Sequence, residues 1–423
     1  MAKILVIGGS LGGLFVANML LRDGHDVTVL EKAQGSMDGR GAGIVTHDAL
    51  FEGLRRAGLV EMDNLGVPIE GRVVLGPQGE SLAAMDMPQV LTSWSRLYDL
   101  LHKAFPSERY LQGVTVEAVT QTDDQVTVRG LVQGQTQTRT QTQTWQADLV
   151  VASDGIRSNV RQQLAPEVQP EYVGYVAWRG VCDESVLSNL TRQTVFEKFG
   201  FGLPQSEQLI GYPVAGEGND TRVGHRAYNF VWYRPTTVDD LKELLTDADG
   251  VHYQGGIPPH KVSWRHIASM RDAAARMMAP QFAEIVQKTA LPFLQPIYDV
   301  CSRQIAFNRV ALMGDASFVA RPHVGMGVTK AADDARAISD ALRAHGATPQ
   351  AWLTYQSQRL HAGQLAVDRA RWLGTYMQSQ IQAKDVQRNS EEVMSETAID
   401  LERYGHLSKF NGAAAHRSSS TAA

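Results

Sequence analysis

Hydrophobic residues recur along the chain in short continuous runs that lead into glycine-containing turns. The first run, Lys3–Ile7, has the length and composition of a strand buried on both faces of a parallel sheet. A helical pattern follows over Leu14–Arg22 and ends at Gly24, before a second strand over Asp26–Leu30. This order predicts a βαβ unit at the start of the chain.

The same strand-to-turn pattern returns twice. The apolar run Leu149–Ala152 leads into Ser153-Asp154-Gly155, and Val310–Met313 leads into Gly314-Asp315, followed by a helix over about 330–344. Pieces of one nucleotide site are thus spread over most of the chain. We therefore expect an α/β fold, with a discontinuous Rossmann-like domain that carries an inserted antiparallel-sheet domain and C-terminal helices.

Aromatic and β-branched residues mark the insertion. Three such stretches, Tyr175–Gly180, Gln208–Tyr212 and Asn229–Arg234, predict an antiparallel sheet over a ligand. The residues of this sheet expected in the core are Trp178, Tyr228, Phe230 and Trp232. The expected boundaries are 1–72, 89–171 and 297–345 for the nucleotide domain, 73–88 and 172–296 for the substrate domain, and 346–423 for a C-terminal helical region and tail.

Two further segments have distinct patterns. Thr348–Gln382 predicts a long helix, with Trp352 and Tyr355 among its packing positions. Thr136–Thr144 alternates Thr and Gln, which predicts an exposed strand of a hairpin, and we assign it no function.

Composition narrows the class of protein. The chain has 423 residues, 43% hydrophobic and 20% charged, with a net charge of −5, as in a globular protein of more than one domain. Lys and Arg are scattered rather than clustered, so we expect no basic patch and no nucleic-acid partner. No window approaches the ~18 apolar residues of a membrane span, so we expect no membrane partner.

The only two cysteines, Cys182 and Cys301, lie far apart without metal-ligand spacing. We therefore expect neither a disulfide framework nor a metal site, and a reducing cytoplasm fits this sparse use of cysteine. The sequence leaves the oligomeric state open, and a homodimer is compatible with it.

The first turn, Gly8-Gly9-Ser10-Leu11-Gly12-Gly13, matches the dinucleotide fingerprint at Gly8 and Gly13, with Ser10 in place of the middle glycine. Glu31, followed by Lys32, ends the next strand. An acid there accepts hydrogen bonds from ribose hydroxyls and repels a 2′-phosphate. This unit predicts a bound dinucleotide but does not distinguish FAD from NAD.

Together with this turn, Ser153–Arg161 and Gly314–Ala316 resemble the three-part signature of the flavoprotein aromatic hydroxylases related to p-hydroxybenzoate hydroxylase. The resemblance implies that FAD is the nucleotide, with Asp315 beside Gly314 binding its ribityl chain. It places Asp154, Gly155 and Arg157 near both the FAD and the path of a nicotinamide nucleotide.

Three more segments carry the resemblance. Arg96 begins an apolar helix and is expected to contact FAD. The backbone of Ala42-Gly43-Ile44-Val45 is expected along the edge of the flavin ring. Gly325-Met326-Gly327-Val328 leads into a helix whose positive end would stabilise the reduced ring. Thr329 stands where the family has Asn, and we expect it to cap that helix.

Tyr175–Gly180, Arg321-Pro322-His323 and Ser10 are most similar to the 2,6-dihydroxypyridine 3-hydroxylase subgroup of this family. The resemblance implies that NADH or NADPH, as a transient co-substrate, reduces FAD. Reaction with O₂ then gives a flavin C4a-hydroperoxide that hydroxylates a hydroxylated pyridine or a similar electron-rich ring. No second glycine fingerprint occurs, in agreement with a family that lacks a nicotinamide-binding domain.

Such a reaction is helped by a base that ionises the substrate hydroxyl. His323 lies in the loop expected to face flavin and substrate, His47 follows the flavin-edge segment, and Tyr212 belongs to the substrate sheet. The alternatives are a loop hydrogen bond for His323, a helix start for His47 and ordinary core for Tyr212.

Two other functions remain open at the level of sequence. One is an FAD-dependent dehydrogenase or oxidase without oxygen insertion. The other is a non-catalytic flavin-binding redox sensor.

Overall fold

A mostly parallel sheet, in which only the pairing of β16 with β17 is antiparallel among the described strands, carries the three expected nucleotide motifs. The computed structural model describes residues 1–35, 43–60, 65–133, 140–378 and 389–410. The sheet has the order β16-β17-β10-β1-β2-β6, and β1 pairs in parallel with β2 and β10, which pairs in parallel with β17. The three motifs therefore meet at one edge of the sheet. Its strands are β1 (Lys3–Ile7), β2 (Asp26–Glu31), β6 (Tyr110–Gln112), β10 (Leu149–Ala152), β16 (Ala306–Phe307) and β17 (Val310–Leu312).

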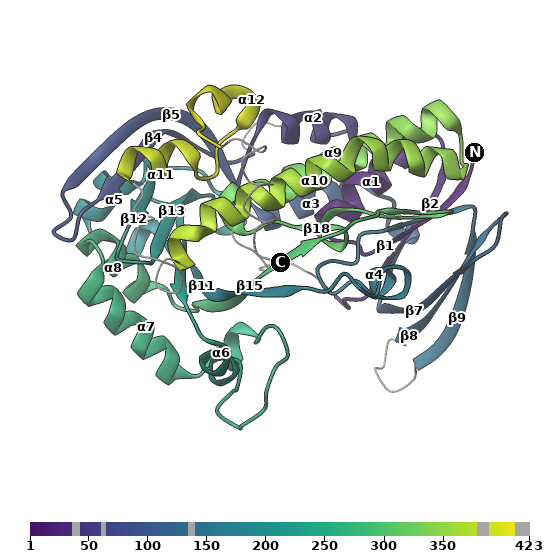
Figure 1. Ribbon diagram of the computed structural model, residues 1–423. Coiled ribbons are helices and arrows are strands. Elements are labelled where there is room, and N and C mark those ends of the chain that lie inside the picture. Colours follow the sequence, from purple (N-terminus) through teal and green to yellow (C-terminus); the bar gives the residue numbers. More distant parts are fainter. Residues whose placement is uncertain (36–42, 61–64, 134–139, 379–388, 411–423) are drawn as a thin grey trace, which may run out of the picture.

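Helices cover this sheet on the side at the top of Figure 1. They are α1 (Leu11–Arg22), α2 (Asp48–Arg56), α3 (Trp94–Ala104), α9 (Gly327–His345) and α10 (Pro349–Gln378). Below lie α4 (Asn159–Leu164) and a sheet of β7 (Val114–Gln121), β8 (Val126–Gln133) and β9 (Thr140–Ala147). The antiparallel pairing of β8 with β9 confirms the predicted hairpin, although 134–139 lie outside the described residues.

The second half is a nine-stranded sheet in the order β18-β15-β11-β14-β13-β12-β4-β5-β3. The three predicted strands fall within β11, β13 and β14, which pair antiparallel and are thus confirmed. β4 and β5 extend beyond the expected 73–88 segment on both sides. The strands are β3 (Gly43–Val45), β4 (Val67–Leu75), β5 (Ser81–Ser93), β11 (Glu171–Asp183), β12 (Lys198–Gly202), β13 (Gln208–Val214), β14 (Ala227–Pro235), β15 (Phe293–Cys301) and β18 (Phe318–Val319).

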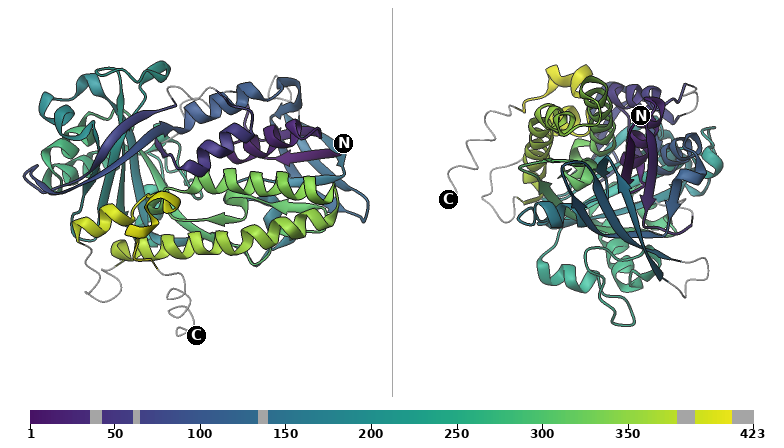
Figure 2. Two further views of the ribbon diagram at one scale, coloured as in Figure 1. Left: turned by 90° about the horizontal axis from the view of Figure 1, so that it is seen from above. Right: turned by 90° about the vertical axis from the view of Figure 1, so that its right-hand side faces the viewer.

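The two faces of this sheet form separate cores, because side chains alternate along each strand. On one face, Trp178, Tyr228, Phe230 and Trp232 pack against helices, as expected. On the other face, Tyr175, Tyr212 and Tyr233 belong to a core directed at the nucleotide half. Figure 2 shows the two halves side by side. The helices on the first face are α5 (Asn189–Val195), α6 (Val238–Leu244), α7 (Trp264–Met277) and α8 (Pro280–Lys288).

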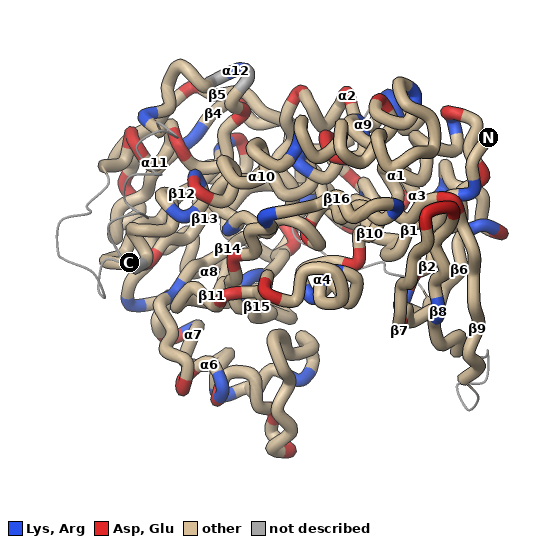
Figure 3. The backbone as a smooth tube through the Cα atoms, turned by 45° about the vertical axis from the view of Figure 1, so that its right-hand side comes forward, with Lys and Arg blue, Asp and Glu red and all other residues tan. Residues whose placement is uncertain are grey.

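The predicted long C-terminal helix is α10, in which Trp352 and Tyr355 are completely buried. Residues 379–382 of that prediction lie outside the described residues. Two short helices follow, α11 (Ser390–Glu396) and α12 (Leu401–Tyr404). No helix in the described part of the chain is long and apolar enough to cross a membrane. Basic and acidic positions are interspersed over the elements in Figure 3.

Candidate active site

The first turn packs so tightly that its final position accepts only glycine. A Cβ on Gly13 would lie 1.8 Å from the carbonyl oxygen of Gly8, so α1 begins directly against β1. Ser10 holds the N-cap position of α1, and its side chain makes no capping hydrogen bond to the described residues. Ser10 also lines the hollows on both sides of the turn. Its position therefore suits the expected phosphate contact.

The first hollow, of about 620 Å³, opens beside Glu31 and Lys32. The Glu31 carboxylate accepts hydrogen bonds from the backbone N–H groups of Gly9 at 2.6 Å and Ala33 at 2.7 Å. These bonds fix the carboxylate and leave lone pairs for ribose hydroxyls.

Asp154 lines the same hollow, together with Gly155 and Arg157. Its Oδ2 accepts the N–H of Val160 at 3.2 Å, whereas its Oδ1 is buried with no hydrogen-bond partner among the described residues. Burial raises the pKa of Asp154. A buried oxygen without a donor is a position that a ligand hydroxyl or N–H can satisfy.

A second hollow, of about 350 Å³, adjoins the first. Ser10, Trp94, Ser153 and Gly155 line both, so the two hollows form one groove past the glycine turn, as a long dinucleotide requires. Ala42 lies outside the described residues. The expected flavin contacts that line the second hollow are Leu11, Gly43, Ile44, Val45, Gly314, Asp315, Gly325, Met326, Gly327 and Val328.

Asp315 projects into this groove from a turn that buried ions hold in place. The Gly314 N–H donates to Asp334 Oδ2 at 3.0 Å, and the Gly314 carbonyl accepts from Lys330 Nζ at 2.8 Å. Arg359 Nε completes the cluster with a 2.7 Å bond to Asp334. The surrounding protein raises the pKa of Asp315, an effect that the charge of Lys330 opposes.

The N-terminus of α9 also faces the groove, through Gly327 and Val328. Met326 holds the N-cap position and makes no side-chain capping bond to the described residues. The positive end of the helix dipole can therefore act on a bound ring. The expectation that Thr329 caps α9 is wrong, because Thr329 lies within the first turn and its Oγ1 lies 2.8 Å from His47 Nδ1.

His47 is the N-cap residue of α2 and is buried. Burial lowers its pKa to about 4, so its ring is neutral at pH 7. His47 lines a separate hollow of about 230 Å³ that also contains Asp48 and Asp400. The structure does not bring His47 to the groove that Asp315 lines.

Polar side chains of the nine-stranded sheet form the far wall of the second hollow. Tyr212 lies directly over the flavin-edge segment, since a Cβ on Gly43 would be 2.3 Å from its ring. Burial raises the pKa of Tyr212 to about 12, so its hydroxyl remains protonated and can donate. Arg179 Nη1 donates to Gln295 Oε1 at 2.7 Å, and Tyr233 completes this wall. The wall therefore offers a cation and hydroxyl donors to a ligand.

His323 lies one layer behind this wall. Its Nε2 lies 2.9 Å from the Tyr175 hydroxyl, and its ring centroid lies 4.2 Å from that of Tyr233. The neighbouring residues Pro322 and Val324 line the hollow, whereas His323 does not. The loop thus faces the groove as expected, whereas the imidazole contacts Tyr233, which lines the groove.

Arg96 lies on α3 and is half-buried. Its Nε is buried and has no hydrogen-bond partner among the described residues, yet Arg96 lines neither hollow. Trp94, two residues earlier, lines both and stacks on Tyr98 with ring centroids 4.9 Å apart. Contact between Arg96 and FAD remains a prediction.

Comparison with known proteins identifies the family. A family model described as FAD binding domain-like matches residues 172–299. The chain is 30% identical over 365 residues to 2,6-dihydroxypyridine 3-monooxygenase of Paenarthrobacter nicotinovorans, covering 85% of this chain and 88% of that protein. The chain belongs to the FAD-dependent aromatic-ring monooxygenases.

Other members of the monooxygenase family support this assignment. The chain is 24% identical to 6-hydroxynicotinate 3-monooxygenase of Pseudomonas fluorescens, covering 82% of this chain and 83% of that enzyme. The solved structure of 2,6-dihydroxypyridine-3-hydroxylase from Arthrobacter nicotinovorans matches with a TM-score of 0.82 at 26% identity. The match covers 93% of this chain and 96% of that one, so the expected fold and subgroup are confirmed.

The groove of this monooxygenase fits FAD by the chemistry of its donors and acceptors. Asp154 and Asp315 present carboxylates to positions suited to hydroxyl donors, and the start of α9 presents backbone N–H groups. A nucleotide with phosphates, ribityl hydroxyls and an electron-accepting ring would supply a partner for each of these features.

Sequence reasoning missed several wall residues of the monooxygenase. Arg179, Tyr233 and Gln295 come from three strands, and no motif marks which face of the sheet is directed at the groove. Alternation along β14 was the available signal, because it separates Tyr233 from the core residue Trp232.

Proposed function

We propose that this monooxygenase hydroxylates a single hydroxylated aromatic ring, with a dihydroxypyridine as the model substrate and O₂ as the oxygen source. The observation that carries the proposal is the wall of Arg179, Tyr212 and Tyr233 opposite the flavin-edge segment. A guanidinium with two hydroxyl donors suits an ionised ring hydroxyl. The names of the relatives that act on 2,6-dihydroxypyridine and 6-hydroxynicotinate agree with this class of substrate.

When bound, FAD supplies the redox chemistry after reduction by NADH or NADPH. The chain supplies the substrate's surroundings. Arg179 stabilises negative charge on the ring, because a charged hydrogen bond favours the ionised hydroxyl. Tyr212 donates a hydrogen bond from its protonated hydroxyl and orients the ring over the flavin-edge segment.

The two candidate histidines take different roles in this proposal. His323 acts on the substrate through Tyr233, which its ring contacts. His47, neutral and bonded to Thr329, supports the first turn of α9 rather than contacting the substrate.

A turnover assay tests the proposal. Purified protein should carry FAD and oxidise NADH or NADPH faster when a dihydroxypyridine is added, and mass spectrometry should find the ring with one added oxygen. Peroxide as the sole oxygen product would instead support an oxidase. Bound flavin that no aromatic compound makes reducible would support a redox sensor.

The cell compartment and oligomeric state belong to the same proposal. Both cysteines are free thiols, which supports a reducing cytoplasm. A homodimer is the state to test by light scattering of the purified enzyme. We further propose that residues 1–72, 89–171 and 297–345 bind FAD, while the nine-stranded sheet supplies most of the substrate wall.

A further inference from the structure

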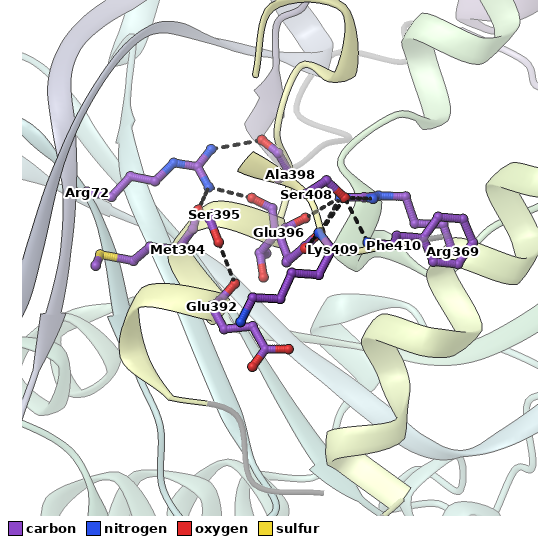
Figure 4. Close-up of polar contacts among 11 residues, drawn as sticks. Arg72, Arg369, Glu392, Met394, Ser395, Glu396, Ala398, Ser408, Lys409 and Phe410 are labelled. Carbon is purple, nitrogen blue, oxygen red and sulfur yellow. Dashed lines mark hydrogen bonds and ion pairs between the residues drawn. The ribbon is translucent and has the colours of Figure 1, made fainter. Parts of the chain in front are cut away.

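The last described segment of the chain returns to the active site. After α10, residues 389–400 run beside the nine-stranded sheet (Figure 4). At Ala398 they contact the loop that contains His323 and Gly325. The motifs named from the sequence do not include this segment. Its Ala398 nevertheless lines the hollow that also contains Asp315 and Tyr212.

A buried arginine holds the C-terminal end of α11. Arg72 on β4 is completely buried and donates to the backbone carbonyls of Met394 at 2.7 Å, Thr397 at 2.5 Å and Ala398 at 2.9 Å. It also donates to Gln89 Oε1 at 2.6 Å. The last carbonyls of a helix lack partners within the helix and carry its negative dipole end. One cation therefore fixes three backbone acceptors of the segment, two of them at the adjacent residues Thr397 and Ala398.

A second anchor attaches the segment to α10. Glu396, which is completely buried, accepts from Arg369 Nη2 at 2.9 Å and from the Ser408 hydroxyl at 2.8 Å. Arg369 also donates to the backbone carbonyl of Glu396 at 3.0 Å. The two anchors leave the residues that follow Glu396 in a defined position.

Ala398 is the point at which the segment meets the flavin loop. Its N–H donates to the His323 carbonyl at 2.8 Å, and its φ of 50° lies in the left-handed region. A Cβ on Gly325, whose φ is 64°, would lie 2.7 Å from the Ala398 Cβ. Gly325 therefore leaves the space that the Ala398 Cβ occupies. Because Ala398 lines the hollow, the added atoms of a larger side chain at 398 can extend into it.

We propose that Ala398 is a specificity-determining residue that sets the size of aromatic ring the site accepts. The inference rests on the proposed function, because it takes the hollow lined by Ala398, Tyr212 and Arg179 as the substrate site. Arg72 and Glu396 are positioning residues that hold Ala398 against this hollow.

The test compares binding of a one-ring and a two-ring ligand, 2,6-dihydroxypyridine and 2,4-dihydroxyquinoline, to the oxidised FAD enzyme. Perturbation of the flavin absorbance gives each Kd without turnover. Ala398→Gly should lower the Kd of the quinoline relative to that of the pyridine by about tenfold. The reason is that one methyl group in a closely fitting pocket changes relative affinity by about this factor. Ala398→Met should shift the ratio at least as far in the opposite direction.

The neighbouring Ile399 gives a matched control, because it is 1% exposed and does not line the hollow. Ile399→Met should leave the ratio unchanged. A ratio that stays within about twofold in both Ala398 variants, with FAD content intact, would overturn the inference. An absence of ring-stimulated NADH or NADPH oxidation in the natural enzyme would instead overturn the proposed function, while the Kd ratios would still decide the role of Ala398.

Discussion

At the scale of single residues, the expected binding of a ligand hydroxyl by Asp315 depends on the residues that hold its turn as much as on its own carboxylate. Lys330 and Asp334 bond to both polar groups of the Gly314 backbone, so the turn is rigid before any ligand binds. A fixed acceptor loses little conformational entropy when a hydroxyl binds to it.

Asp315→Ala should therefore produce a protein that folds but purifies with little or no FAD. The variant loses a charge-assisted acceptor and keeps the Lys330–Asp334 cluster that supports the turn. Flavin absorbance relative to protein absorbance measures the loss. Asp340→Ala, on the exposed face of α9, is the control and should retain FAD. Full occupancy in Asp315→Ala would contradict the ribityl assignment.

His47 predicts a dependence of stability on pH. Its pKa in the folded protein is about 4, below the 6.5 of an unfolded histidine, so between these values the unfolded chain binds the additional proton. The contribution of His47 to the free energy of unfolding is fully present above pH 6.5. It falls by about 3 kcal/mol in all as the pH drops towards 4.

Urea denaturation at several pH values checks this expectation. His47→Gln removes the titrating group, so its free energy of unfolding should fall less between pH 6.5 and 4 than that of the natural protein. Equal slopes for the two proteins would show that His47 is not held neutral.

Tyr175 and His323 provide a pair of variants for testing a role behind the substrate wall. Tyr175→Phe removes only the hydroxyl that lies 2.9 Å from His323 Nε2, whereas His323→Ala removes the ring that contacts Tyr233. Both should retain FAD. His323→Ala should lower kcat and change its pH profile, with a smaller change in Tyr175→Phe. An unaltered pH profile in both would exclude His323 from the reaction.

At the scale of elements, strand and helix positions followed from the hydrophobic pattern, whereas the order of the strands did not. β1, α1, β2 and α10 lie within a few residues of their predicted bounds, because their periodicity is strong. The pairing of β4 with β12 joins segments more than a hundred residues apart, and no local signal encodes it. The same limitation applies to the segment that carries Ala398.

Arg72 shows why this C-terminal segment escaped prediction. Its partners in this segment are backbone carbonyls up to 326 residues away, and a backbone carbonyl has no side-chain signature in a sequence. Glu396 and Arg369 are ordinary charged residues until the fold buries both.

Arg72→Met should lower the free energy of unfolding by at least about 3 kcal/mol, because three buried carbonyls lose their donor. Urea denaturation measures the change. Arg55→Met is the matched control, since the Arg55 side chain is 55% exposed, and it should cost under about 0.5 kcal/mol. Equal values for the two variants would mean that the segment is not anchored through Arg72.

At the scale of the whole molecule, the groove lies where the two sheets meet. Ser10, Ser153 and Asp315 reach it from the parallel sheet, and Tyr212 and Arg179 reach it from the nine-stranded sheet. A ligand that fills this groove contacts both halves, so its binding energy opposes their separation as well as their unfolding.

FAD should consequently stabilise the molecule as one cooperative unit. At a free concentration of one hundred times its Kd, it should add about 2.7 kcal/mol to the free energy of unfolding and raise Tm. Calorimetry of the flavin-free protein with and without added FAD checks this, and Asp315→Ala should show a much smaller rise at the same concentration. If FAD stabilised only one of two separate transitions, the groove would belong to one half alone, and the substrate wall would have to form without the flavin.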